Sequence, residues 1–240
     1  MYRNTFLSVM FLACCFNGSL CAQSDAQIYE RTCDAKTYPF SDPSPVATPN
    51  NSYYPYFRFD GFSMQAQEKQ WKMVVLENDY VKLTVTPEIG GKIWGAIDKV
   101  NNKEFVYTNG VVKFRDVAMR GPWTSGGIEF NFGIIGHAPT CSTPIDYLTK
   151  KNVDGSVSCH IFSYEWITRT VWNVEINLPK DKAYFTTHTT WFNQSSIDQP
   201  YYQWMNAGYA TKTGTRFYYP GTYSIGPVSY THLTLPTKLE

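Results

Sequence analysis

The chain has 240 residues, with 21 lysines and arginines against 20 aspartates and glutamates, and its formal net charge is +1. Basic residues are not clustered along it. Because binding to nucleic-acid phosphates requires such clusters, the composition argues against nucleic acid as a partner. Aromatic residues form 17% of the chain, the same share as charged residues. This suits either the core of a β-sandwich or the binding of sugar rings against flat aromatic faces.

Residues 1–22 predict a secretory signal peptide. Arg3 supplies a positive charge, residues 5–13 are apolar, and small and polar residues lead to Ala22, after which we expect cleavage. The apolar run is too short to span a bilayer, and no later segment is apolar enough to form a transmembrane segment. We therefore predict an exported, periplasmic protein. The alternative is a lipoprotein, because residues 12–14 resemble a lipobox that would place a lipid anchor on Cys14.

Residues 23–52 predict a leader with little regular structure, because they are polar and rich in proline. The prolines are Pro39, Pro43, Pro45 and Pro49. The domain itself is expected to span residues 53–226, and the aromatic residues from Tyr53 onward suggest an edge strand at its start.

Short strands with an alternating pattern follow from residue 71. In residues 80–86, Val81, Leu83 and Val85 share one face of an extended strand, with polar residues on the other face. Further strands are predicted over residues 71–76, 92–97, 105–107, 157–166, 170–178 and 183–192. Many short strands with almost no helical periodicity predict an all-β sandwich.

The most distinctive stretch is residues 126–140, with four glycines, one carboxylate, one histidine, one amide and no lysine or arginine. Glu129 and Asn131 are two residues apart, so on an extended strand they point to the same face. His137 follows in the next predicted turn. A carboxylate and an imidazole on one concave face can perform general acid–base chemistry. The alternative is a glycine-rich hairpin loop with a surface glutamate and a polar histidine.

Several segments resemble a known family, the domain-of-unknown-function family 5107. The most specific are Gly126-Gly-Ile-Glu-Phe-Asn131 and Gly136-His-Ala-Pro-Thr140, and residues 83–99 and 204–208 add to them. That family is common in exported proteins of Bacteroidota and often precedes tetratricopeptide repeats. The resemblance implies a galactose-mutarotase-like antiparallel β-supersandwich, a fold shared with aldose epimerases and with β-domains of polysaccharide-degrading enzymes. It also implies a carbohydrate ligand.

This resemblance, together with the acidic and imidazole groups, predicts a carbohydrate-active enzyme, either a glycoside hydrolase or an epimerase-like enzyme. Glu129 and His137 are the predicted catalytic residues, with the two neighbouring phenylalanines desolvating the carboxylate. Asn131 would orient a sugar hydroxyl or Glu129 itself. Further predicted sugar contacts are Arg120, Trp123, Trp204 and Asn206. The alternative function is a non-catalytic carbohydrate-binding module of a larger repeat-containing protein.

No cofactor is predicted. Lys92 directly follows Gly90 and Gly91 and is interpreted as a turn residue. Glu129 and His137 are suitable metal ligands, but two ligands are too few to predict a metal site. The cysteines after the signal peptide are Cys33, Cys141 and Cys159. Export favours disulfides, but three cysteines cannot all pair within the chain. The alternatives are one bridge with a free thiol, or a partner cysteine outside these residues.

The last residues predict an artificial tail. Residues 228–237 resemble the in-frame translation of a transposon adapter used to prepare sequencing libraries. We therefore expect residues 227–240 to be a non-native tail, and the sandwich to lack its C-terminal side. The missing part would hold the second carboxylate that glycoside hydrolysis uses, and it would include helical repeats if the family pattern holds.

Overall fold

The computed structural model describes residues 24–47, 54–117, 121–133, 136–216 and 218. The predicted signal peptide, Arg120 and the predicted tail lie outside these residues. The chain divides into two compact units, residues 1–209 and 210–240. The strands of the described residues all belong to the first unit. In the second unit, the described residues include a turn in which the Thr215 N–H donates to the Lys212 carbonyl oxygen at 3.0 Å.

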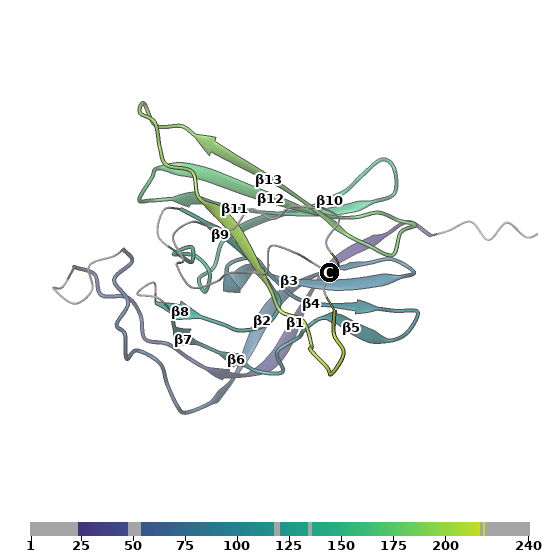
Figure 1. The fold of residues 1–240 in the computed structure, drawn as a ribbon, viewed down its shortest axis with the longest axis horizontal. Helices are drawn as coiled ribbons and strands as arrows, with labels where there is room; N and C mark the ends of the chain where they lie inside the picture. Colours follow the sequence, from purple (N-terminus) through teal and green to yellow (C-terminus); the bar gives the residue numbers. More distant parts are fainter. Residues whose placement is uncertain (1–23, 48–53, 118–120, 134–135, 217, 219–240) are drawn as a thin grey trace, which may run out of the picture. The chain divides into compact units, whose positions relative to one another are not determined.

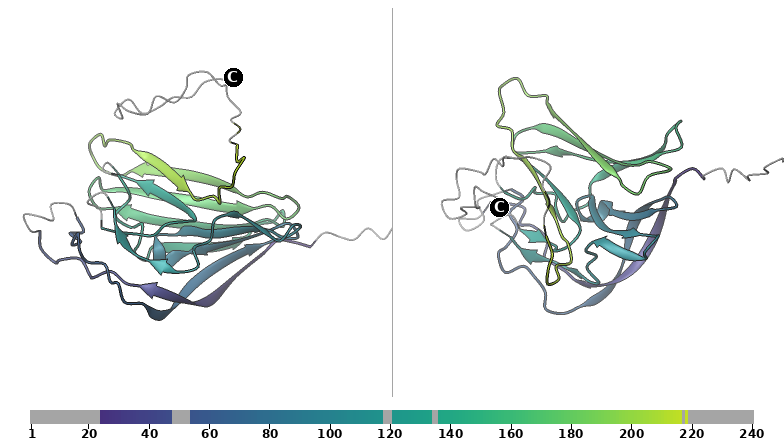
Figure 2. Two further views of the ribbon diagram at one scale, coloured as in Figure 1. Left: turned by 60° about the horizontal axis from the view of Figure 1, so that its bottom comes forward. Right: turned by 45° about the vertical axis from the view of Figure 1, so that its right-hand side comes forward.

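Two mainly antiparallel sheets form the first unit (Figures 1 and 2). The larger sheet contains β1 (Gln27–Tyr38), β2 (Gln67–Glu77), β3 (Val81–Thr86), β4 (Lys92–Asp98), β5 (Lys103–Val106), β6 (Val112–Lys113), β9 (Ile128–Phe132) and β14 (Gln203–Ala207). Its order is β14-β9-β4-β3-β2-β1-β6, with β5 also paired to β4. The pairing of β1 with β6 is parallel.

The smaller sheet joins four strands in chain order: β10 (Asp146–Lys151), β11 (Val157–Glu165), β12 (Thr170–Leu178) and β13 (Thr186–Asn193). A separate short pair consists of β7 (Arg115–Asp116) and β8 (Pro122–Trp123). A single turn of 3₁₀ helix, η1 (Pro87–Ile89), connects β3 to β4.

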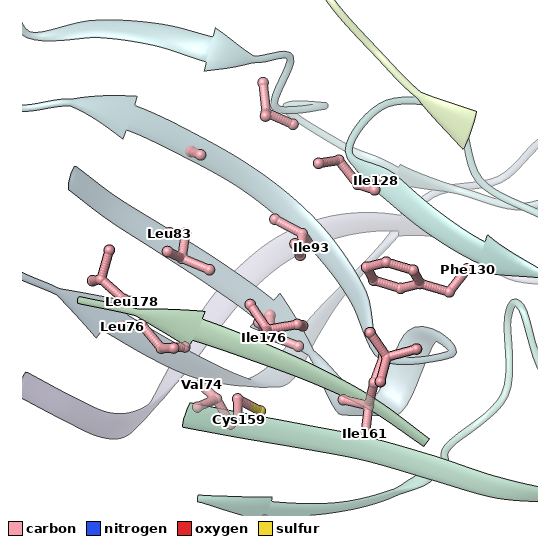
Figure 3. Close-up of a cluster of buried hydrophobic side chains, with 14 of the residues drawn as sticks. Val74, Leu76, Leu83, Ile93, Ile128, Phe130, Cys159, Ile161, Ile176 and Leu178 are labelled. Carbon is pink, nitrogen blue, oxygen red and sulfur yellow. The ribbon is translucent and has the colours of Figure 1, made fainter. Parts of the chain in front are cut away.

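The two sheets pack face to face around one main hydrophobic core (Figure 3). Leu83 of the larger sheet and Ile176 of the smaller sheet are both fully buried in it. Phe132 of β9 stacks on Trp172 of β12, with ring centroids 4.5 Å apart. The faces that alternation predicts for residues 80–86 and 170–178 are the faces that contribute to this core. The predicted all-β sandwich is therefore confirmed.

The opposite face of the larger sheet is also buried. A second hydrophobic cluster there contains Trp71, Met73, Ile89, Trp94, Val112 and Phe114. The register between β3 and β4 skips Trp94, which is the extra residue of a β-bulge. Because of this bulge, Ile93 and Ala96 both reach the main core although they are an odd number of residues apart. Trp94 and Lys92 point to the opposite face of the sheet. Strand β4 therefore contributes side chains to both of its buried faces.

The structure corrects several local predictions. Residues 23–52 are not without regular structure, because they contain β1, which pairs with β2 from Gln27 to Thr37. The edge strand predicted after Tyr53 is absent from the described residues 54–66, where Phe62 makes one isolated bridge with Phe40. The strands β10 and β14 were not predicted. Most side chains of β1, β10 and β14 are exposed or half-buried, so these strands lack the alternation that reveals a half-buried strand.

The described residues also bear on membrane-spanning helices and on disulfides. Within the described ranges, no helix has the length and apolar character that crossing a membrane requires. Cys33 and Cys159 are free thiols in the part of the chain that the structure describes. No bridge therefore joins any two of the three cysteines there.

Candidate functional site

Strand β9 has two buried faces of different chemistry. Ile128 and Phe130 face the main core (Figure 3), as does Phe132. Glu129 and Asn131 face the other side. The expectation that the two phenylalanines desolvate Glu129 is wrong, because successive residues of a strand point to opposite faces. Glu129 is nevertheless only 3% exposed, so groups on its own face must bury it.

Two glycines before β9 bring this strand close to its neighbours. Gly126 and Gly127 have φ values of +76° and +67°, which residues with side chains rarely adopt. A Cβ atom on Gly127 would lie 2.2 Å from the Ile93 carbonyl oxygen of β4. On the other side, the Gly127 carbonyl accepts the Gly208 N–H at 2.8 Å, just after β14. The glycines thus permit the close backbone approach that sets Glu129 between β4 and β14.

Glu129, Asn131 and His137 form one hydrogen-bonded group. Asn131 Nδ2 donates to Glu129 Oε1 at 2.8 Å, and Asn131 Oδ1 accepts the Ala138 N–H at 2.8 Å. His137 Nδ1 lies 2.5 Å from the same Oε1 atom. Asn131 therefore holds both the carboxylate and the turn that carries the histidine. The His137 side chain is 13% exposed, so it is the more accessible member of the pair.

Lys92 completes this group from β4, and its interpretation as a turn residue is wrong. It is 2% exposed, and its Nζ lies 3.8 Å from Glu129 Oε2. The same Nζ donates to the Thr124 carbonyl oxygen at 2.5 Å and to Thr124 Oγ1 at 3.2 Å. Burial lowers the pKa of Lys92, and the charges of Glu129 and Cys141 oppose this shift. The sequence gives no local signal for this role, because Lys92 directly follows the Gly90–Gly91 turn and precedes the apolar run of residues 93–97.

Two tryptophans lie against His137. The ring centroid of Trp204, on β14, is 4.8 Å from that of His137, and the centroid of Trp123, on β8, is 6.0 Å away. Among the described residues, Trp123 Nε1, Trp204 Nε1 and Glu129 Oε2 are buried and have no hydrogen-bond partner. Two donors and one acceptor next to His137 are therefore buried with no hydrogen bond from the described residues.

The structure brings most of the predicted site residues together. Those that lie together are Glu129, Asn131, His137, Trp123, Trp204 and Asn206, and Lys92 joins them. In the register of β9 and β14, Asn206 lies opposite Glu129 and Trp204 lies opposite Asn131. Since directly paired residues point to the same face, Asn206 is on the face of the site, and its side chain is exposed. Arg120 lies outside the described residues.

Two cavities adjoin this region without being lined by Glu129 or His137 in the described part of the chain. They have volumes of about 330 and 270 Å³ and share four lining residues, Pro43, Phe57, Thr143 and Pro144. Ala138, the residue after His137, lines the larger one. No group of three or more His, Cys, Asp or Glu side chains among the described residues could hold a metal ion. The arrangement itself can orient an imidazole and move a proton.

Comparison with known proteins adds a family and a structural neighbour. The family described as "Domain of unknown function (DUF5107)" matches residues 48–233. A solved structure of a TPR-domain containing protein from Parabacteroides distasonis ATCC 8503 is similar, with a TM-score of 0.70 and 27% sequence identity. The similarity covers 77% of this chain and 32% of that chain. This chain therefore spans about a third of the length of that protein.

Proposed function

The chain belongs to the DUF5107 family of domains, as its motifs predict, and on this premise we propose that it is a carbohydrate-active enzyme with an acid–base site at Glu129 and His137. The proposed reaction is an epimerase-like proton transfer at a sugar ring. The fold that the family resemblance implies supports a sugar as the ligand. Since a fold alone does not determine function, the proposal rests on the side chains of the site.

The contact between Glu129 Oε1 and His137 Nδ1 at 2.5 Å carries this proposal. A carboxylate on Nδ1 orients an imidazole ring and stabilises the imidazolium that forms when Nε2 takes a proton. Because His137 is the more exposed of the two, His137 is the group that would meet the substrate. Glu129 would act through the histidine. The two residues, both predicted from the sequence to be catalytic, therefore receive different roles: His137 is the acid–base group and Glu129 positions it.

The same geometry favours proton transfer over glycoside hydrolysis. Hydrolysis uses two carboxyl groups that flank the scissile bond, but Glu129 Oε1 is engaged by Asn131 and His137. Glu165, another buried glutamate, accepts three hydrogen bonds from Ile167 and Thr168. Epimerase-like opening of a sugar ring breaks the bond between the anomeric carbon and the ring oxygen. A base takes the proton of the anomeric hydroxyl, and an acid gives a proton to the ring oxygen that leaves. A histidine can perform both steps in turn.

The tryptophans supply recognition in this proposal. Their rings offer flat apolar surfaces for a sugar ring, and their N–H groups can donate to sugar hydroxyls. The exposed amide of Asn206, opposite Glu129 on β14, adds a further donor and acceptor. The charges of Lys92 and Glu129 balance each other, which suits a neutral sugar rather than an acidic one.

We further propose that the protein works in the periplasm as one module of a larger repeat-containing protein. The signal-peptide pattern of residues 1–22 supports export. The similarity to a TPR-domain containing protein supports an association with helical repeats.

Exchange between sugar anomers tests the reaction. The full chain is mixed with galactose, glucose and other aldoses, and the rate of α/β interconversion is measured by NMR at pH 7. We expect acceleration over buffer, and a loss of about a hundredfold or more in His137→Gln with sugar binding retained. His188→Gln is the matched control, because His188 is an exposed histidine on β13 and should not affect the rate.

Two outcomes would change the proposal. Sugar binding without any acceleration by the intact protein would identify a non-catalytic carbohydrate-binding module. Neither binding nor acceleration with any of the aldoses would overturn a role in sugar chemistry.

A further inference from the structure

Asn131 determines where the protons of the buried group lie. Its Oδ1 accepts the main-chain N–H of Ala138, and because a main-chain N–H can only donate, the amide orientation is settled. Nδ2 is then the atom that donates to Glu129 Oε1. As the ionised carboxylate that pairs with Lys92, Glu129 can only accept hydrogen bonds, so the proton between Oε1 and His137 belongs to Nδ1. The other ring nitrogen, Nε2, is left without a proton when the ring is neutral.

Lys92 balances the charge of the buried carboxylate. Its ammonium lies 3.8 Å from Glu129 Oε2, and both side chains are almost fully buried. The carbonyl and hydroxyl oxygens of Thr124 accept its other N–H groups. The cation and the anion together make a neutral pair. The ammonium therefore weakens the attraction of the carboxylate for a positive charge on the imidazole.

The neighbours of the ring come from several elements. Among the described residues, Glu129 from β9 contacts His137, and Lys92 from β4 pairs with Glu129. The charge of Cys141, from the histidine's own loop, raises the pKa of Lys92. Trp123 from β8 and Trp204 from β14 carry no charge. The Lys92–Glu129 pair is therefore the charged pair that the described contacts place next to His137.

We propose that Lys92 is a positioning residue that keeps His137 neutral, with its proton on Nδ1 and with Nε2 open to take a proton from the substrate. This rests on the proposed function only in naming His137 as the base. Without the ammonium, the buried carboxylate would draw its counter-cation from the ring. His137 would then be an imidazolium, which cannot act as a base.

The state of the ring can be measured without any substrate. Long-range ¹H–¹⁵N NMR of the full chain at pH 7 reports which nitrogens of His137 carry protons, with the signals assigned through His137→Gln. In the wild type we expect the neutral ring protonated on Nδ1. In Lys92→Met we expect the imidazolium-to-imidazole ratio to rise at least about tenfold, as the loss of a neighbouring charge predicts. In Lys92→Met/Glu129→Gln, which lacks both charges, the ring should again be neutral.

A matched control separates this effect from general loss of a salt bridge. Lys99 follows the other end of β4, pairs with Glu77 Oε1 at 2.7 Å and also donates to the Asn78 carbonyl oxygen. Lys99→Met should leave His137 neutral.

A second readout is the pH profile of anomer exchange. Lys92→Met should be slow at pH 7 and regain activity as the pH rises and the imidazolium loses its proton, whereas the wild type should not show this recovery.

The protonation state of the ring and the rate of anomer exchange are measured independently, so the role of Lys92 and the proposed reaction can fail separately. A wild-type ring protonated on Nε2, or a neutral Lys92 side chain seen by ¹⁵N NMR, would overturn the inference even if Lys92→Met failed to fold. A His137 that stays neutral in a folded Lys92→Met would overturn it while leaving the role of His137 in exchange intact. The expected ring states in a protein that does not accelerate anomer exchange would support the inference and remove the proposed function.

Discussion

Glu129 and Glu165 are buried to the same extent, at 3% and 4% exposure, but different groups satisfy them. Glu165 ends β11, and its oxygens accept the N–H of Ile167 at 3.2 Å and the N–H and Oγ1 of Thr168 at 2.6 and 2.5 Å. All of these donors lie within three residues. Glu129 is held by side chains only, which come from β9 itself, from the following turn and from β4.

The difference separates a structural carboxylate from a reactive one. Two main-chain N–H groups and the Thr168 hydroxyl engage both oxygens of Glu165 and close the turn into β12. Glu129 has one oxygen shared by two side chains and another with no hydrogen bond among the described residues. Its partners are side chains that can be displaced, and one of them is the partly exposed His137. Burial alone therefore does not mark a functional acid, whereas the chemical nature of its partners does.

Removing Lys92 should have the largest effect on stability. Lys92→Met removes the buried ammonium beside Glu129 and leaves only the partly exposed ring of His137 to supply a counter-charge, so we expect a loss of up to about 3–5 kcal/mol. Urea denaturation measures the change. Lys99→Met removes a lysine that is 34% exposed and should cost about 1 kcal/mol or less. Equal losses in the two variants would mean that the Lys92–Glu129 pair is not a stabilising contact.

Glu165→Gln should weaken the fold without affecting the chemistry. An amide nitrogen in place of one carboxylate oxygen cannot accept the Thr168 donors, so we expect a loss of about 2–3 kcal/mol. The rate of anomer exchange should stay unchanged. Glu129→Gln is the counterpart, in which exchange is lost. A fall in exchange in folded Glu165→Gln would contradict the distinction between the two carboxylates.

Cys159 is a third buried acid, and unlike the two glutamates it lies in the main hydrophobic core. Burial raises the pKa of its thiol to about 12, from an ordinary value of 9.0. Between these two values the unfolded thiol ionises while the folded one stays protonated, so stability is lost as the pH rises from about 9 to 12. From pH 8.5 to 10.5, the wild type should lose about 2 kcal/mol more than Cys159→Val. Parallel losses would show that the thiol does not contribute to the alkaline transition.

Trp204→Phe should have the smallest effect. It keeps a ring against His137 and removes the N–H that has no partner among the described residues. We expect sugar affinity to fall about fivefold, or about 1 kcal/mol, with stability little changed. Titration calorimetry against the best-bound aldose checks this. Trp166→Phe, at a largely exposed tryptophan after β11, should bind as the wild type does, and an equal loss there would exclude Trp204 as a specific contact.

Much of the sandwich follows from local pattern. Residues 80–86 and 170–178 are strands with one buried face because burial in a sheet repeats every two residues. The strands β1 and β14 escape this signal, since main-chain pairing rather than burial holds most of their length. The bulge at Trp94 is also invisible in the pattern, and it decides which residues of β4 reach each face.

Within the site, the sequence by itself determined the family, the all-β class and the shared face of Glu129 and Asn131, because these depend on motifs and on the two-residue period of a strand. Only the tertiary structure decided that His137 reaches the Glu129 carboxylate, that Trp204 arrives through the register of β14, and that Lys92 lies beside the same carboxylate. The physical reason is that these partners meet through strand pairing between distant segments, such as Ile93 with Ile128. Local periodicity carries no information about which strands pair.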